Sequence, residues 1–123
     1  EELNLQIFIV AIPMGSLACA ILAINNLRDR AQDPIVGKKT LAVRLGDSGA
    51  RKLYIALLIS AHLFALLTLA PAVLLTLLAT PLTWSLARGV ASGVSGADLI
   101  PYLAKTGKLQ LAFALLFALG LII

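Results

Sequence analysis

The chain alternates between long apolar stretches and short polar segments. The apolar stretches cover about residues 5–24, 53–70, 72–87 and 109–123. The first contains roughly 20 residues without a charge, which is the length that an α-helix needs to cross the hydrocarbon core of a bilayer. We expect Pro13 to kink the first helix, Pro71 to mark a tight turn, and Pro81 to break the third stretch. The pattern predicts an all-α membrane protein with four transmembrane helices in a single domain, residues 1–123.

The composition of the chain makes lipid the expected solvent of these stretches. Hydrophobic residues make up 60% of the chain and charged residues 13%. A soluble domain usually has about 45–50% apolar and about 25% charged residues. A very apolar soluble bundle that lacks its partner is the less favoured alternative. Within this chain the single cysteine, Cys19, and the single histidine, His62, exclude a disulfide framework and a multi-histidine metal site.

The basic residues predict an orientation in the membrane. All ten Lys and Arg residues lie in two polar segments, residues 25–52 and 88–108. Four alternating spans would place both segments on one side of the bilayer, and the positive-inside rule makes that side the cytoplasm. Membrane orientation therefore accounts for the net charge of +4, and no nucleic-acid partner is expected. We expect a multi-pass protein of the cell (inner) membrane.

The first polar segment carries a pair of carboxylates with helical spacing. If the first helix continues past the membrane edge, Asn25, Asp29 and Asp33 share one of its faces. Pro34 disfavours the α conformation at Asp33, which is therefore expected at the helix end. The two carboxylates repel each other, and the helix dipole disfavours negative charge at this end. A Mg²⁺ ion would relieve both penalties while leaving coordination sites for substrate phosphates, so Asp29 and Asp33 are the candidate metal ligands.

Polar and basic side chains around the acidic pair are suited to a diphosphate. Cations bind phosphate oxygens through charge-assisted hydrogen bonds, and amides can support a metal site. The candidate substrate-binding residues are Asn25, Asn26, Lys38, Lys39 and Arg44. Gly37 gives the backbone the freedom to turn between the acidic and the basic groups. Two alternatives remain open: Arg28 and Arg30 could neutralise the carboxylates in an ordinary solvated loop, and the basic residues could be cytoplasmic anchors.

Residues 25–46 read N-N-L-R-D-x-x-x-D-x-x-x-G-K-K-T-L-A-V-R-L-G. This string resembles the second Asp-rich motif of the UbiA superfamily of intramembrane prenyltransferases. Within the superfamily it is most similar to the 1,4-dihydroxy-2-naphthoate polyprenyltransferases of menaquinone synthesis. Relatives that act on 4-hydroxybenzoate tend to have an acidic residue in place of Gly37. The end of the chain, from Ile100 to Leu121, is also similar to the last loop and helix of the family.

The resemblance implies a fold, a cofactor and a reaction. The four spans would correspond to the last four of a nine-helix bundle. Mg²⁺ held by Asp29 and Asp33 would assist transfer of a polyprenyl group from polyprenyl diphosphate to 1,4-dihydroxy-2-naphthoate, with decarboxylation, giving demethylmenaquinone. The first Asp-rich motif of the family does not occur here, and Asp47 and Asp98 are isolated acidic residues. We therefore interpret the chain as the C-terminal part of the enzyme, with the N-terminal half missing, and expect it to be inactive alone.

Two other functions remain as alternatives. The first is a related prenyltransferase with another aromatic acceptor, such as 4-hydroxybenzoate, homogentisate or a chlorophyll precursor. The second is a non-enzymatic membrane subunit whose acidic pair binds a cation.

Four other side chains have simpler interpretations. His62 lies in the middle of a span, where a neutral histidine bonded to a neighbouring helix is the favoured reading. Tyr54 and Trp84 are expected to be anchors at the membrane interface. Lys105, near the start of the last span, fits a snorkelling lysine.

Overall fold

The structure is a computed structural model that describes residues 5–67, 74 and 76–122. All regular structure within these residues is helical, and they contain no strand. The elements are α1 (Leu5–Arg28), α2 (Leu41–Leu66), a 3₁₀ turn (Leu77–Ala79), α4 (Thr80–Ala91), a second 3₁₀ turn (Gly96–Leu99) and α5 (Ile100–Ile122). The predicted all-α class is therefore confirmed for the described part of the chain.

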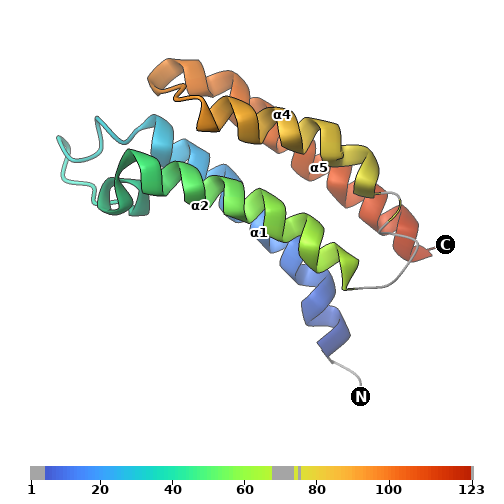
Figure 1. Ribbon diagram of the computed structural model, residues 1–123. Helices are drawn as coiled ribbons and strands as arrows, with labels where there is room; N and C mark the ends of the chain where they lie inside the picture. The colour runs from blue at the N-terminus through green and yellow to red at the C-terminus, as the bar shows by residue number, and fades with distance from the viewer. Residues whose placement is uncertain (1–4, 68–73, 75, 123) are drawn as a thin grey trace.

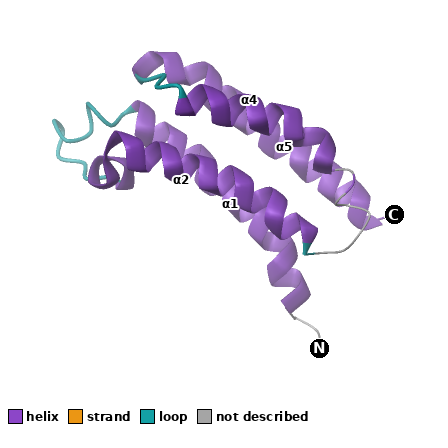
Figure 2. Ribbon diagram, in the orientation of Figure 1, coloured by secondary structure: helices purple, strands orange, loops and turns teal. Residues whose placement is uncertain are grey.

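The helices form two hairpins that lie side by side (Figure 1). Helices α1 and α2 pack along each other with their chains running in opposite directions, and α4 pairs with α5 in the same way. Helix α5 also contacts α1, which joins the two hairpins. Figure 2 shows the loop after α1 and the turn after α4 at the same end of the bundle, opposite the start of α1 and the end of α5. We call this the loop end.

Three segments are long and apolar enough to cross a membrane: Ala11–Arg28, Leu41–Leu66 and Gly96–Gly120. Helix α4 has 12 residues and is about 18 Å long, which is less than a hydrocarbon core of about 30 Å. The predicted turn at Pro71 lies outside the described residues. The predicted break at Pro81 is confirmed, because the 3₁₀ turn Leu77–Ala79 gives way there to α4, and Pro81 lies in the first turn of α4. A proline is tolerated there, since the N–H that it lacks would have no helical partner.

Helices α2 and α5 begin well before the apolar stretches that predicted them. Helix α2 begins at Leu41, where the side chain of Thr40 accepts a hydrogen bond from the Val43 N–H at 3.4 Å. Helix α5 begins at Ile100, directly after the second 3₁₀ turn. An apolar stretch reports only the part of a helix that lies in lipid, whereas capping and local hydrogen bonds decide where the helix begins.

The buried core consists of small and large apolar side chains from all four helices, among them Leu17, Leu58, Leu86 and Phe113. Large apolar side chains also cover the outside of the helices, as Leu63 and Leu111 do, with exposed fractions of 55% and 64%. An apolar outer surface is costly in water but suits a helix that faces lipid. The distribution of apolar side chains thus agrees with a membrane protein.

Polar side chains inside the bundle pair across helices. Tyr54 was predicted to be an interfacial anchor, but it is completely buried, and its hydroxyl lies 2.6 Å from Oγ1 of Thr106 on α5. Oγ1 of Thr106 donates to the carbonyl of Tyr102 at 2.7 Å, so Tyr54 is the donor to Thr106. Nε2 of His62 lies 2.8 Å from Oγ1 of Thr83 on α4, which confirms the predicted bond of this histidine to a neighbouring helix. Each bond removes a polar group from contact with lipid.

A Tyr54→Phe substitution is expected to lower the free energy of unfolding by about 0.6–1.5 kcal/mol, because it deletes one buried hydrogen bond between helices. Denaturation of the full-length protein in detergent micelles measures this change. Tyr102→Phe is the matched control, since the Tyr102 hydroxyl makes no hydrogen bond to any part of the chain that the structure describes. Equal losses in the two variants would contradict a specific contribution of the Tyr54–Thr106 bond.

Candidate metal and diphosphate site

The acidic pair lies where α1 ends. The helix stops at Arg28, but the N–H of Asp29 still donates to the carbonyl of Asn25 at 3.2 Å. The N–H of Asp33 donates in turn to the carbonyl of Asp29 at 2.9 Å. These bonds have the helical i to i−4 pattern, so the three residues follow one another at intervals of about one turn. The helix ends earlier than Pro34 predicted, at Arg28, so Asp33 lies in the turn that follows it and not at the helix end.

A glycine turn closes this segment. The N–H of Lys38 donates to the carbonyl of Asp33 at 2.7 Å, and the N–H of Gly37 donates to the carbonyl of Pro34 at 3.2 Å. Gly37 has φ of +83°, a conformation that a side chain disfavours. These two bonds and the positive φ form a Schellman motif, which ends a helical turn and reverses the chain. The expected turn at Gly37 is confirmed, and it brings Lys38 back beside Asp33 in the backbone.

Asp33 is the unusual carboxylate of the pair. Its exposed fraction is 8%, although Gln32 and Pro34 on either side are exposed. Its carboxylate makes no hydrogen bond or ion pair with a described residue. Every fully buried side-chain oxygen among those residues has a hydrogen-bond partner, so the oxygens of Asp33 are not fully buried. The oxygens of Asp33 therefore remain accessible. An accessible carboxylate without an ion-pair partner can bind a cation.

Asp29 differs, because an arginine already pairs with it. Nε of Arg28 lies 3.0 Å from Oδ1 and Nη2 lies 3.1 Å from Oδ2, a bidentate pair. These hydrogen bonds, with a smaller contribution from the charge of Lys38, hold the pKa of Asp29 below its usual value. The alternative in which arginines neutralise the loop therefore applies to Asp29. No arginine among the described residues forms an ion pair with Asp33: Arg30 lies instead 3.9 Å from Asp47, and Arg28 acts on Asp33 only through its charge from a longer distance.

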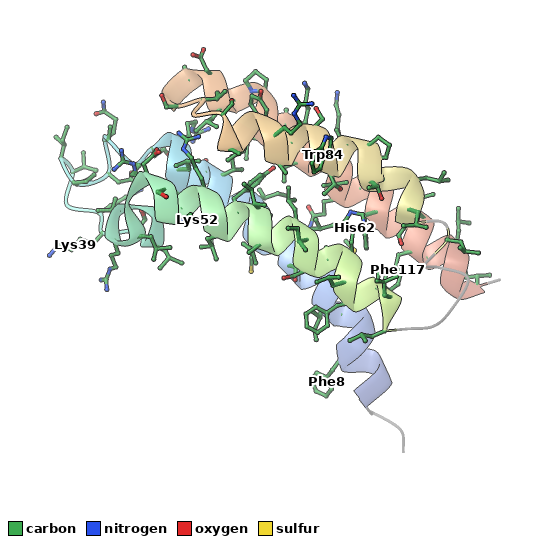
Figure 3. The ribbon with its side chains drawn as sticks, in the orientation of Figure 1. Phe8, Lys39, Lys52, His62, Trp84 and Phe117 are labelled. Carbon is green, nitrogen blue, oxygen red and sulfur yellow. The ribbon has the colours of Figure 1, made fainter. Side chains whose placement is uncertain are left out.

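The basic candidates lie on the surface of the loop. Lys38, Lys39 and Arg44 are exposed, and Figure 3 shows Lys39 at the outer end of the molecule. Nε of Arg44 donates to the carbonyl of Lys39 at 3.3 Å, so Arg44 supports the backbone of the loop. The two lysines have no ion-pair partner in the described ranges. They remain available to an anion.

The two asparagines are partly buried at the end of α1. Asn25 supplies the backbone carbonyl that accepts from Asp29. Asn26 borders an apolar cavity of about 270 Å³ between α1 and α2, which Cys19 and Leu53 also line. The structure therefore places Asn25 next to the acidic pair and Asn26 beside an apolar space.

Asp47 has a role that the sequence interpretation missed. It is isolated from other acidic residues, but Arg51 binds it through two hydrogen bonds of 2.8 and 3.0 Å. Arg51 is only 7% exposed, and its Nη1 also donates to the carbonyl of Val90 at 2.7 Å. The i, i+4 spacing of Asp47 and Arg51 on a helix was the signal in the sequence that could have predicted the pair. The contact with Val90 had no such signal.

The side chains fit part of a Mg²⁺ site. No cluster of three or more His, Cys, Asp or Glu side chains occurs within residues 5–67, 74 and 76–122. Mg²⁺ in proteins is commonly held by one or two carboxylates, with water and substrate phosphates completing an octahedron. Asp29 and Asp33 would supply such carboxylates, and the exposed lysines would supply positive charge for phosphate. Further ligands would have to come from water, phosphate or another segment.

Comparison with known proteins identifies the family. The model of the UbiA prenyltransferase family matches residues 1–96. The chain is 44% identical over 110 residues to the 1,4-dihydroxy-2-naphthoate octaprenyltransferase of Mycobacterium tuberculosis, covering 88% of this chain and 38% of that protein. It is 39% identical over 129 residues to the enzyme of the same name from Haemophilus influenzae, covering 100% and 42%.

The Escherichia coli protein of that name is 41% identical over 114 residues, covering 87% of this chain and 36% of the relative. The chain thus spans about two fifths of the length of the curated relatives that it matches. No solved structure matches it. Since the family model covers most of the chain, and since the Asp-rich segment lies within the matched residues, this chain belongs to the UbiA prenyltransferase family.

Proposed function

We propose that this chain is part of a Mg²⁺-dependent membrane prenyltransferase of menaquinone synthesis. The reaction transfers a polyprenyl group from polyprenyl diphosphate to 1,4-dihydroxy-2-naphthoate, with loss of CO₂, and gives demethylmenaquinone. The observation that carries the proposal is the accessible, unpartnered carboxylate of Asp33, about one turn after Asp29. The names of the relatives, which are octaprenyltransferases acting on that naphthoate, support the choice of acceptor.

The residues of the loop have distinct roles in this proposal. Asp29 and Asp33 hold Mg²⁺, directly or through water, and Asn25 and Asn26 support them at the end of α1. Lys38, Lys39 and Arg44 contact the diphosphate; their exposure on the loop supports the assignment. When bound, Mg²⁺ supplies positive charge that stabilises the diphosphate as the allylic C–O bond breaks.

The chain's own side chains act on the same leaving group. Lys38 and Lys39 are compact cations on flexible stems, so they can follow the negative charge that develops on the departing diphosphate. The apolar surfaces of the helices suit a polyprenyl tail, which would be costly to expose to water. In the alternative, a non-enzymatic cation-binding subunit, these basic residues would have no substrate to bind.

The proposed topology is the one that the family resemblance and the basic residues imply. The four apolar stretches correspond to the last four of nine helices in one transmembrane domain of the inner membrane. Segments 25–52 and 88–108 face the cytoplasm. The common position of the loop after α1 and the turn after α4 at the loop end supports placing both segments on one side.

Product formation by the full-length protein in detergent or lipid vesicles tests the function. We expect demethylmenaquinone from 1,4-dihydroxy-2-naphthoate and a polyprenyl diphosphate, loss of product with a chelator, and recovery with Mg²⁺. Faster turnover of 4-hydroxybenzoate or homogentisate would favour a related enzyme with another acceptor. Mg²⁺ binding that does not respond to diphosphate, without turnover of any acceptor, would favour the non-enzymatic subunit.

The 123-residue chain by itself is expected to show no turnover. The proposal requires a first Asp-rich motif to complete the metal site, and these residues do not contain one. Activity of the purified chain measures this, with the full-length protein as the positive control. Robust Mg²⁺-dependent product formation by the 123 residues would contradict the proposed half-site.

A further inference from the structure

A buried arginine connects two helices at the loop end. Arg51 on α2 donates two hydrogen bonds to the carboxylate of Asp47, at 2.8 and 3.0 Å. Its third bond, at 2.7 Å, goes to the carbonyl of Val90 in the last turn of α4. A cation is favourable at this position, because the last carbonyls of a helix carry negative partial charge. Arg51 thereby connects segment 88–108 to segment 25–52 at the loop end.

The same carboxylate faces the acidic loop. Nε of Arg30 lies 3.9 Å from Oδ1 of Asp47, and Arg30 lies between Asp29 and Asp33 in the chain. The pair is partly exposed and weak by itself, with side-chain exposed fractions of 39% and 47%. Asp47 is nevertheless held in place, because Arg51 fixes both of its oxygens. The contacts run from the acidic loop through Asp47 and Arg51 to α4.

The chemistry of the arginine is specific for this connection. A guanidinium presents donors in a rigid planar fork, which can bind both oxygens of a carboxylate and a carbonyl at once. A lysine keeps the charge but has one ammonium group on a flexible stem, and it cannot reproduce all three bonds. A buried cation also requires its partners, since an unpaired charge away from water is unfavourable.

We propose that Arg51 is a positioning residue for the metal and diphosphate loop. By holding Asp47 against the end of α4, it sets the place of Arg30 and of the turn that carries Asp29 and Asp33. The inference rests on the proposed function, because it assigns to Arg51 an effect on Mg²⁺ and diphosphate without contact with either. Binding of the aromatic acceptor is not expected to depend on Arg51 in the same way.

Kinetics of the full-length protein test the inference, with Arg51→Gln and Arg51→Lys compared with wild type. For Arg51→Gln we expect about a tenfold rise in the half-saturating Mg²⁺ concentration and in KM for polyprenyl diphosphate, as for other residues that orient metal ligands. KM for 1,4-dihydroxy-2-naphthoate is expected to change less than about twofold, and Arg51→Lys to restore only part of the loss. Lys52→Gln is the matched control: it removes a neighbouring exposed charge (Figure 3) and should behave as wild type.

Hydrogen exchange in the same variants gives a readout that does not need activity. Arg51→Gln is expected to speed exchange in residues 29–40 while leaving the middle of α1 and α2 protected as in wild type. Asp47→Asn should have the same local effect, and it serves if Arg51→Gln does not fold. Unchanged exchange in 29–40, or faster exchange throughout both helices, would overturn the inference. A wild-type protein that turns over no acceptor would contradict the proposed function. The hydrogen-exchange result would still decide the role of Arg51.

Discussion

Replacing Asp33 with asparagine in the full-length protein is expected to lower Mg²⁺-dependent prenyl transfer by at least about 100-fold, since even residues that only support metal ligands often cost 10–100-fold. The fold should survive, because the carboxylate makes no hydrogen bond or ion pair with a described residue that the amide would break. An amide oxygen is a weaker ligand for a hard cation than a carboxylate. Activity as a function of Mg²⁺ concentration, together with thermal unfolding, measures both effects.

Asp98→Asn is the matched control for this substitution. Asp98 is an exposed carboxylate in the 3₁₀ turn Gly96–Leu99, at the same end of the bundle, and it should tolerate loss of its charge. A similar fall in activity for Asp98→Asn would mean that general charge loss, and not metal binding, explains the result. A wild-type Mg²⁺ response in Asp33→Asn would remove the case for Asp33 as a ligand.

Asp29→Asn is also expected to abolish turnover without unfolding the protein. The surroundings of Asp29 differ from those of Asp33. Its carboxylate is already bound by Arg28, so a cation must compete with the guanidinium for the same two oxygens. The hydrogen bonds that lower the pKa of Asp29 keep it ionised at neutral pH. Its pairing with Arg28 is present above the usual aspartate range and is lost as the pH falls through the lowered pKa. Retained activity in Asp29→Asn would count against a ligand role.

Gly46→Ala is the second substitution with a large expected effect. Gly46 interrupts the helical conformation of α2 with φ of 76° and ψ of 176°, a combination that is almost confined to glycine. The turn separates Leu41–Leu45, which continue the motif, from the long apolar part of the helix. Alanine there should cost about 1–3 kcal/mol of unfolding free energy, or force the first turn of α2 to move. Either result is expected to reduce Mg²⁺-dependent activity.

Unfolding in denaturant and activity should be measured on Gly46→Ala beside Gly107→Ala. Both glycines have open space where a new Cβ would lie, but only Gly46 has a positive φ. Gly107 lies within α5, where alanine should be neutral or stabilising by roughly 0.5–1 kcal/mol. Wild-type stability and activity in Gly46→Ala would contradict the claim that the backbone conformation at this turn requires glycine.

Much of the candidate site could be predicted from local sequence alone. The spacing of Asp29 and Asp33 and the turn at Gly37 both depend on residues within a few positions of each other. The hydrogen bonds of the loop follow those expectations. The break at Pro81 is also local, because a proline fits the first turn of a helix but not its interior, and α4 begins at Thr80.

The sequence by itself determined the helical class, the apolar character of the helices and the place of the acidic segment between basic residues. These properties depend on periodicity, composition and short-range geometry. Only the tertiary structure decided which polar groups meet: Arg51 with Val90, 39 positions away, and Tyr54 with Thr106, 52 positions away. A polar side chain on an apolar helix needs a partner, but its sequence neighbourhood does not say which helix supplies one. Packing of the two hairpins settles that choice, and with it the connection of the acidic loop to α4.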